Sequence, residues 1–147
     1  MQNDTNTKGY NQWFYFSFRN MKTRKVRFNV VNFIKKRLMF LDGVRPVGFS
    51  MKSHHSKSEE QQESTKGWHT IGSNIAYKKS YISREIQGPK GSAPTFKNYY
   101  TLSFDVEFPH DDDSYYIAMN YPYTYSAMMS FVDRVVQNQP KSLYLFV

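Results

Sequence analysis

Aromatic residues recur at every second position along much of this chain, and this spacing strongly limits what the chain can fold into. The densest case is the run from Gln12 to Phe18, in which Phe14, Phe16 and Phe18 alternate with other residues. Successive side chains of a β-strand point to opposite faces, so the three rings share one face. Phe, Tyr and Trp make up 18% of the 147 residues and favour strands. The pattern predicts a chain built mostly of strands.

Further strands are expected wherever apolar residues alternate between turn signals. These strands span residues 25–33, 37–41, 44–49, 67–72, 74–77, 99–108, 114–121 and 143–147. The residues from Arg19 to Arg24 suit a hairpin loop between the first two strands. Asp42-Gly43 is a two-residue turn signal, because both positions tolerate positive φ. Residues 50–66 are polar without periodicity and predict a long surface loop.

One segment near the end of the chain has helical spacing. Ser126 is the expected N-cap, and the apolar face consists of Met128, Phe131, Val132, Val135 and Val136. Together the elements predict an all-β fold, an antiparallel β-sandwich with one short C-terminal helix. Residues 1–126 would form the sandwich domain, and residues 127–147 a helix and a strand leading out of it.

Positive charge is concentrated in the N-terminal part of the chain. Residues 1–50 hold 10 Lys and Arg against 2 Asp and Glu, within a net charge of +8 for the whole chain. Three interpretations are open: a solvated face, a surface for an acidic protein partner, or a nucleic-acid surface. The last is the least favoured, because the nearby aromatics alternate as core residues do. The candidate basic patch consists of Arg24, Lys25, Arg27, Lys35, Lys36, Arg37 and Arg45.

No residue pattern points to a catalytic centre or a metal site. The chain has no Cys, and none of its four His is followed three residues later by Glu. His54-His55 lies in a polar tract that could not hold a rigid coordination sphere. The three consecutive aspartates at 111–113 fit a turn better than a calcium loop, with side-chain oxygens bonding nearby backbone amides. We therefore expect no catalytic residue, metal ligand or cofactor here, and no membrane-spanning segment.

Several motifs, in order, resemble the N-terminal domain of the cytosolic carboxypeptidase family. The two most specific are Gly9-Tyr10-Asn11-Gln12-Trp13-Phe14-Tyr15-Phe16 near the start and Tyr121-Pro122-Tyr123-Thr124-Tyr125-Ser126 near the end. Between them, residues 26–33, 43–50, 67–77 and 99–104 match in sequence order. Tyr10 stands where the family often has His.

The resemblance implies that the full enzyme is a zinc metallocarboxypeptidase that trims glutamates from glutamylated tubulin tails. It also implies a cytoplasmic location, with possible sites of action at microtubules or cilia. The zinc-binding catalytic domain would follow Ser126, where this sequence has 21 more residues, so the chain alone is expected to be inactive. The domain's first strand is also expected to be missing.

The implied role is to pack on and support that catalytic domain. Tyr121, Pro122, Tyr123, Thr124 and Tyr125 are the candidate interdomain seam, since Tyr combines apolar area with a hydroxyl group. An alternative for this segment is that it completes the domain's own core. An alternative for the whole chain is a stand-alone binding module for an acidic protein partner such as tubulin tails, without peptidase activity.

Overall fold

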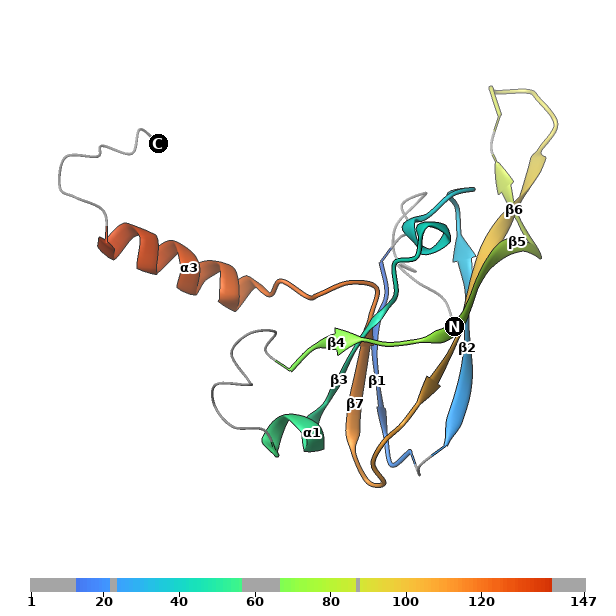
Figure 1. The fold of residues 1–147 in the computed structure, drawn as a ribbon. Helices are drawn as coiled ribbons and strands as arrows, with labels where there is room; N and C mark the ends of the chain where they lie inside the picture. Colours follow the sequence, from blue (N-terminus) through green and yellow to red (C-terminus); the bar gives the residue numbers. More distant parts are fainter. Residues whose placement is uncertain (1–12, 22–23, 57–66, 87, 139–147) are drawn as a thin grey trace.

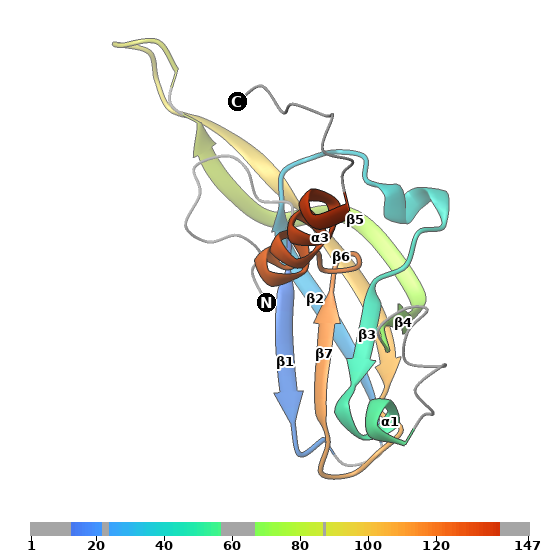
Figure 2. The same ribbon diagram turned by 90° about the vertical axis from the view of Figure 1, so that its left-hand side faces the viewer.

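Two antiparallel sheets face each other in this protein (Figures 1 and 2). The computed structural model describes residues 13–21, 24–56, 67–86 and 88–138. Sheet A has the strand order β1 (Tyr15–Arg19), β7 (Ser114–Ala118), β3 (Val47–Ser50) and β4 (His69–Thr70). Sheet B has the order β2 (Lys25–Phe33), β6 (Thr95–Glu107) and β5 (Ser73–Ile86). The described residues also form η1 (Met39–Asp42), α1 (Met51–His55) and α3 (Tyr125–Asn138). The predicted sandwich with a C-terminal helix is confirmed.

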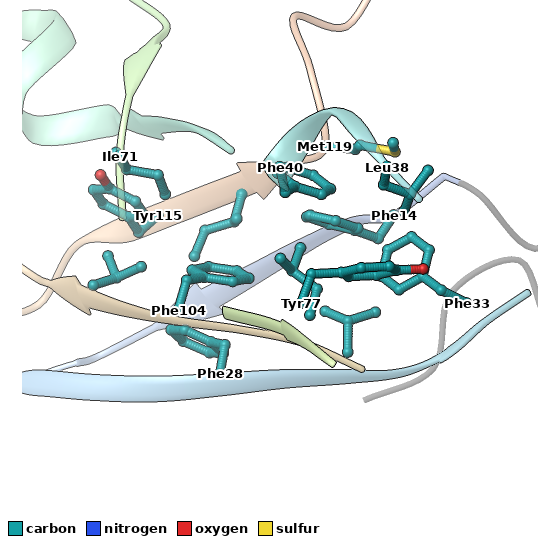
Figure 3. Packing of buried hydrophobic residues seen from close by; sticks show 14 of the residues in the cluster. Phe14, Phe28, Phe33, Leu38, Phe40, Ile71, Tyr77, Phe104, Tyr115 and Met119 are labelled. Atoms are coloured by element: carbon teal, nitrogen blue, oxygen red, sulfur yellow. The ribbon is translucent and has the colours of Figure 1, made fainter. Parts of the chain in front are cut away.

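Aromatic rings fill the space between the two sheets (Figure 3). Phe14 is buried, and Phe16 and Phe18 of β1 pack against the same core, as their alternation predicts. The rings of Phe18 and Phe28 lie 5.0 Å apart, and those of Phe28 and Phe104 lie 5.6 Å apart. Such tilted ring pairs add about 0.5–1.5 kcal/mol each beyond the burial of their apolar area.

The expected hairpin between the first two strands is wrong. Tyr15 of β1 lies opposite Ala118 of β7, whereas Lys25 of β2 lies opposite Glu107 of β6. The chain therefore passes from sheet A to sheet B after Arg19. Alternation shows which residues face the core, but it does not distinguish a neighbour in the same sheet from a strand across the core.

The Asp42-Gly43 signal does not join two strands. Residues 39–42 form a turn of 3-10 helix, and Gly43 ends it with a φ of +91°. Gly43 has the positive φ that the signal predicts, which only Gly adopts without a Cβ penalty. The predicted hairpin is wrong, because the same conformation also caps a helix and does so here.

A helix occupies the first part of the segment expected to be a loop. Ser50 is the N-cap of α1, and its hydroxyl oxygen accepts from Ser53 N at 3.0 Å. Asp113 accepts from Ser50 Oγ at 2.6 Å and from Lys52 N at 3.0 Å. The carboxylate of Asp113 thus binds residues far away in sequence instead of the neighbouring amides expected for a turn. Residues 57–66 of the predicted loop lie outside the described residues.

β5 and β6 both extend beyond the predicted strands. They form a two-stranded ribbon that reaches past the sandwich (Figure 1), with Ser83 opposite Asn98 and Ile86 opposite Thr95. The prediction ended the first of these strands at residue 77 and began the second at 99, because the ribbon is rich in polar residues.

The other differences concern the ends of elements. β4 and β7 are shorter than predicted. α3 begins at Tyr125, and Thr124 Oγ1 accepts from Ala127 N at 3.2 Å, so Thr124 and not Ser126 caps the helix. The strand predicted at 143–147 lies outside the described residues. None of the helices in the described ranges is long and apolar enough to cross a membrane.

Candidate functional site

The predicted seam lies between β7 and α3 and is largely exposed. Tyr121, Tyr123 and Tyr125 are 47%, 68% and 72% exposed. Pro122 is half-buried, and Thr124 is exposed and caps α3. The alternative in which these tyrosines complete the domain's own core is therefore wrong. Their role as an interdomain seam remains a prediction.

α3 continues from this segment and projects away from the sandwich (Figures 1 and 2). No other helix or strand of the described ranges packs extensively on it. An amphipathic helix of a globular protein gains its stability mainly by burying its apolar face. The apolar face is open here, and its exposed members are Met128, Phe131, Val132, Val135 and Val136.

Four aromatic rings cover the face of sheet A that points away from the core, and we call them the outer aromatic cluster. Its members are Tyr15, Phe49, Trp68 and Tyr116. Tyr15 lies with its ring centroid 6.1 Å from Trp68 and 6.1 Å from Tyr116. Phe49 lies 5.6 Å from Trp68 and 6.1 Å from Tyr116. Partial burial, with Tyr116 as a second cause, raises the pKa of the Tyr15 phenol.

The alternation of side chains along β1 and β7 explains why these rings point outward. Neighbouring positions on β1 and β7 carry core residues such as Phe16 and Ile117, so Tyr15 and Tyr116 must face the other side. The outer aromatic cluster lies on the side of sheet A toward which α3 projects (Figure 1). The sequence contained a signal for it, namely a strand with aromatic residues on both of its faces.

Part of the candidate basic patch forms a mixed-charge cluster at the start of β2. Arg27 donates to Asp105 at 2.7 Å, and Lys25 lies 3.9 Å from Asp105 and 3.8 Å from Glu107. The hydrogen bond from the Asn74 amide, followed by those cations, lowers the pKa of the Asp105 carboxyl. Arg45 lines a pocket shared with both carboxylates. These cations therefore have acidic neighbours within the chain.

The remaining cations of the candidate patch lie elsewhere. Lys35, Lys36 and Arg37 follow the far end of β2, and that end, at Phe33, lies six positions or about 20 Å along the strand from Arg27. Arg37 is itself paired with Asp42 at 2.7 Å, and Arg24 precedes β2 as an exposed residue. The structure does not bring the seven predicted residues into one patch.

The histidines and aspartates are dispersed in the same way. His110 Nε2 lies 2.8 Å from Ser53 Oγ, and His69 Nε2 lies 3.4 Å from the hydroxyl of Tyr115. Within the described ranges, no three His, Asp or Glu side chains gather in a way that could hold a metal ion. No zinc chemistry can be derived from these residues.

Curated proteins with similar sequences are cytosolic carboxypeptidases. The chain is 34% identical over 146 residues to cytosolic carboxypeptidase 1 of Xenopus laevis, which covers 98% of this chain and 11% of the relative. It is 35% identical over 149 residues to cytosolic carboxypeptidase 1 of Gallus gallus, with the same coverage. It is 31% identical over 145 residues to cytosolic carboxypeptidase 2 of Danio rerio, covering 98% of this chain and 18% of the relative.

The resemblance to the cytosolic carboxypeptidase family is thereby confirmed. The chain spans about a tenth of the length of the relatives of type 1, which is the share that one domain would occupy. No protein-family model matches the chain.

Proposed function

The chain is homologous to one short segment of the cytosolic carboxypeptidases, and we propose that it is their non-catalytic N-terminal β-sandwich domain, which packs on and supports a carboxypeptidase catalytic domain. Carboxypeptidase activity enters this proposal only through the names of the relatives. The described residues of this chain contain no recognisable catalytic set or metal cluster. The proposal therefore assigns the chemistry to another part of the whole enzyme and a structural role to this chain.

One observation carries the proposal: α3 exposes its apolar face, and the segment that leads into it carries three exposed tyrosines. In the outer aromatic cluster Tyr15 is also exposed, whereas Phe49, Trp68 and Tyr116 are half-buried. Exposed apolar patches of this kind mark interfaces, and Tyr, Trp, Phe and Met are enriched in interface cores. A folded catalytic domain would cover this surface and bury the face of α3.

In this proposal the whole enzyme, and not this chain alone, binds zinc in its catalytic domain and removes glutamate from acidic tails such as those of glutamylated tubulin. The whole enzyme would act in the cytoplasm, at microtubules or at cilia. The alternative function, a stand-alone binding module for an acidic protein partner, receives little support from the predicted basic patch. The cations of that patch are dispersed, and four of them lie beside carboxylates.

A binding experiment tests the docking surface. The purified chain is titrated into Xenopus laevis cytosolic carboxypeptidase 1 from which the homologous segment has been deleted, and the heat of binding is measured. We expect a complex with the natural chain and binding at least about tenfold weaker with Phe131→Asp/Val135→Asp, because charge on the apolar face opposes its burial. The variant should unfold at the same temperature as the natural chain, since α3 does not contribute to the sandwich core.

The matched control is Ser130→Asp/Gln137→Asp, which adds the same charge elsewhere on α3. Equal weakening by the two double variants, or no binding by the natural chain, would contradict the proposal. If the truncated enzyme does not fold, the chain can replace the homologous segment in the intact enzyme. Phe131→Asp/Val135→Asp should then lower the yield of folded chimera, and the control should not.

A further inference from the structure

A cationic pocket lies at the β5–β6 ribbon, on the other sheet from the docking surface. It has a volume of about 360 Å³. Lys79 and Arg84 come from β5, Lys97 from β6, and Lys36 from the segment after β2. None of the residues that line it is acidic. Of these four cations, only Lys36 belonged to the predicted basic patch.

The cations of this pocket lack carboxylate partners among the described residues, unlike those around Asp105. Arg84 lies directly opposite Lys97 in the antiparallel register. Like charges at directly opposed positions destabilise a strand pair. In addition, the buried Nε of Arg84 has no hydrogen-bond acceptor among the described residues. Buried donors are normally satisfied, so the Arg84 guanidinium has a donor that the described residues leave unused.

Protection of a sheet edge explains only part of this arrangement. β5 is an edge strand of sheet B, and lysines on an edge discourage pairing with other chains. Beyond Tyr100, β6 also lacks a second neighbour, so edge protection accounts for Lys97 as well. It does not account for Lys36, which lies outside the sheet and lines the same pocket.

We propose that this pocket binds an acidic peptide segment in an extended conformation, with its carboxylates paired to Lys36, Lys79, Arg84 and Lys97. A bulge in β5 places Lys79 opposite Tyr100 and Arg84 opposite Lys97, only three positions apart on β6, or about 10 Å along the sheet. An extended peptide places alternate side chains about 7 Å apart, so two carboxylates on one face match this length.

The aromatic residues of the ribbon favour a peptide over nucleic acid. Single-stranded nucleic acid is held by successive bases stacked on free aromatic faces. The ring of Tyr100 is stacked on Tyr77 at 5.6 Å, and Arg84 lies over the ring of Tyr99 at 6.0 Å. Phe96, which is 66% exposed, offers an apolar contact beside the cations but not a series of stacking platforms.

The test measures binding of a fluorescent octaglutamate peptide to the full chain by anisotropy at low salt. We expect saturable binding that Lys79→Gln/Arg84→Gln/Lys97→Gln weakens at least about tenfold. The matched control, Arg19→Gln/Lys78→Gln/Lys90→Gln, removes the same charge outside the pocket and should weaken binding less than about threefold. A single-stranded oligonucleotide with eight phosphates should bind more weakly than the peptide.

A second variant separates a binding role from a structural one. Lys97→Glu should raise the midpoint of thermal unfolding, because it replaces the repulsion from Arg84 with attraction, and it should still weaken peptide binding at least about tenfold. No peptide binding, equal loss in the two triple variants, or tighter binding of the oligonucleotide would each overturn the proposal. The inference is independent of the proposed docking on a catalytic domain, because the peptide experiment uses this chain alone.

Discussion

The buried Tyr115 couples the stability of this fold to pH. Its side chain is buried against Gly48, where an added Cβ would lie 2.6 Å from the phenol oxygen. Burial, with the carboxylate of Asp113 as a second cause, raises the pKa of Tyr115 to about 12. The same environment thus explains both the small residue on β3 and the difficulty of charging the phenol.

The elevated pKa predicts a loss of stability in alkali. An unfolded tyrosine releases its proton near pH 10, so the contribution of Tyr115 is complete below pH 10 and is lost as the pH rises toward about 12. The loss is about 2–3 kcal/mol. Urea unfolding of the natural chain and of Tyr115→Phe at pH 8 and 11.5 measures it, and the variant should lose less stability between the two pH values. Tyr123→Phe, at an exposed position, is the control, and equal losses in all three proteins would contradict the assignment.

At the scale of elements, α3 differs from every strand of the sandwich because its apolar face has no partner in the described chain. It is 14 residues long, close to the length at which isolated helices are marginal in water. The Thr124 cap contributes about 1 kcal/mol toward keeping its first turn formed. The strands, in contrast, share the aromatic core.

We therefore expect fast hydrogen exchange in α3 when the chain is studied alone. Its amides should exchange at least about a hundredfold faster than those of β6 around Leu102, which is fully buried. Mass spectrometry of peptides from the two elements measures this difference. Thr124→Ala should accelerate exchange in α3 and leave β6 unchanged. Protection of α3 equal to that of β6 would show that the helix is already stabilised within this chain.

At the scale of the whole molecule, the two proposed surfaces lie on different sheets. The apolar surface belongs to sheet A and the segment after it, whereas the cationic pocket belongs to sheet B and the β5–β6 ribbon. A catalytic domain seated on the first surface would leave the second accessible. The arrangement allows a supporting domain to hold an acidic segment at the same time.

The domain by itself should lack peptidase activity. Incubation of the chain with zinc and a peptide ending in several glutamates should release no glutamate above the buffer blank, because the described residues gather no metal ligands. Free glutamate is measured by mass spectrometry, with an intact cytosolic carboxypeptidase 1 as the positive control. Zinc-dependent turnover by the chain would refute its non-catalytic assignment.

Local sequence determined the fold class. Alternation at Phe14, Phe16 and Phe18 predicted strands and their core side, because the period of a strand is a property of the backbone. The family motif at Tyr121–Tyr125 lies in a segment whose tyrosines are exposed, and its role as an interdomain seam stays a prediction.

Tertiary structure alone decided which strands are neighbours and where charge accumulates. The same alternation fits a partner beside a strand or one across the core, so the placement of β1 and β2 in different sheets could not be predicted. Lys36, the pair Lys79 and Arg84, and Lys97 come from three separate segments and meet only in the folded chain. Of the seven cations predicted to form one patch, Lys25, Arg27 and Arg37 are paired with carboxylates, and Arg45 lines a pocket with two more. Electrostatic sites depend on distance in space, and that distance is set by packing.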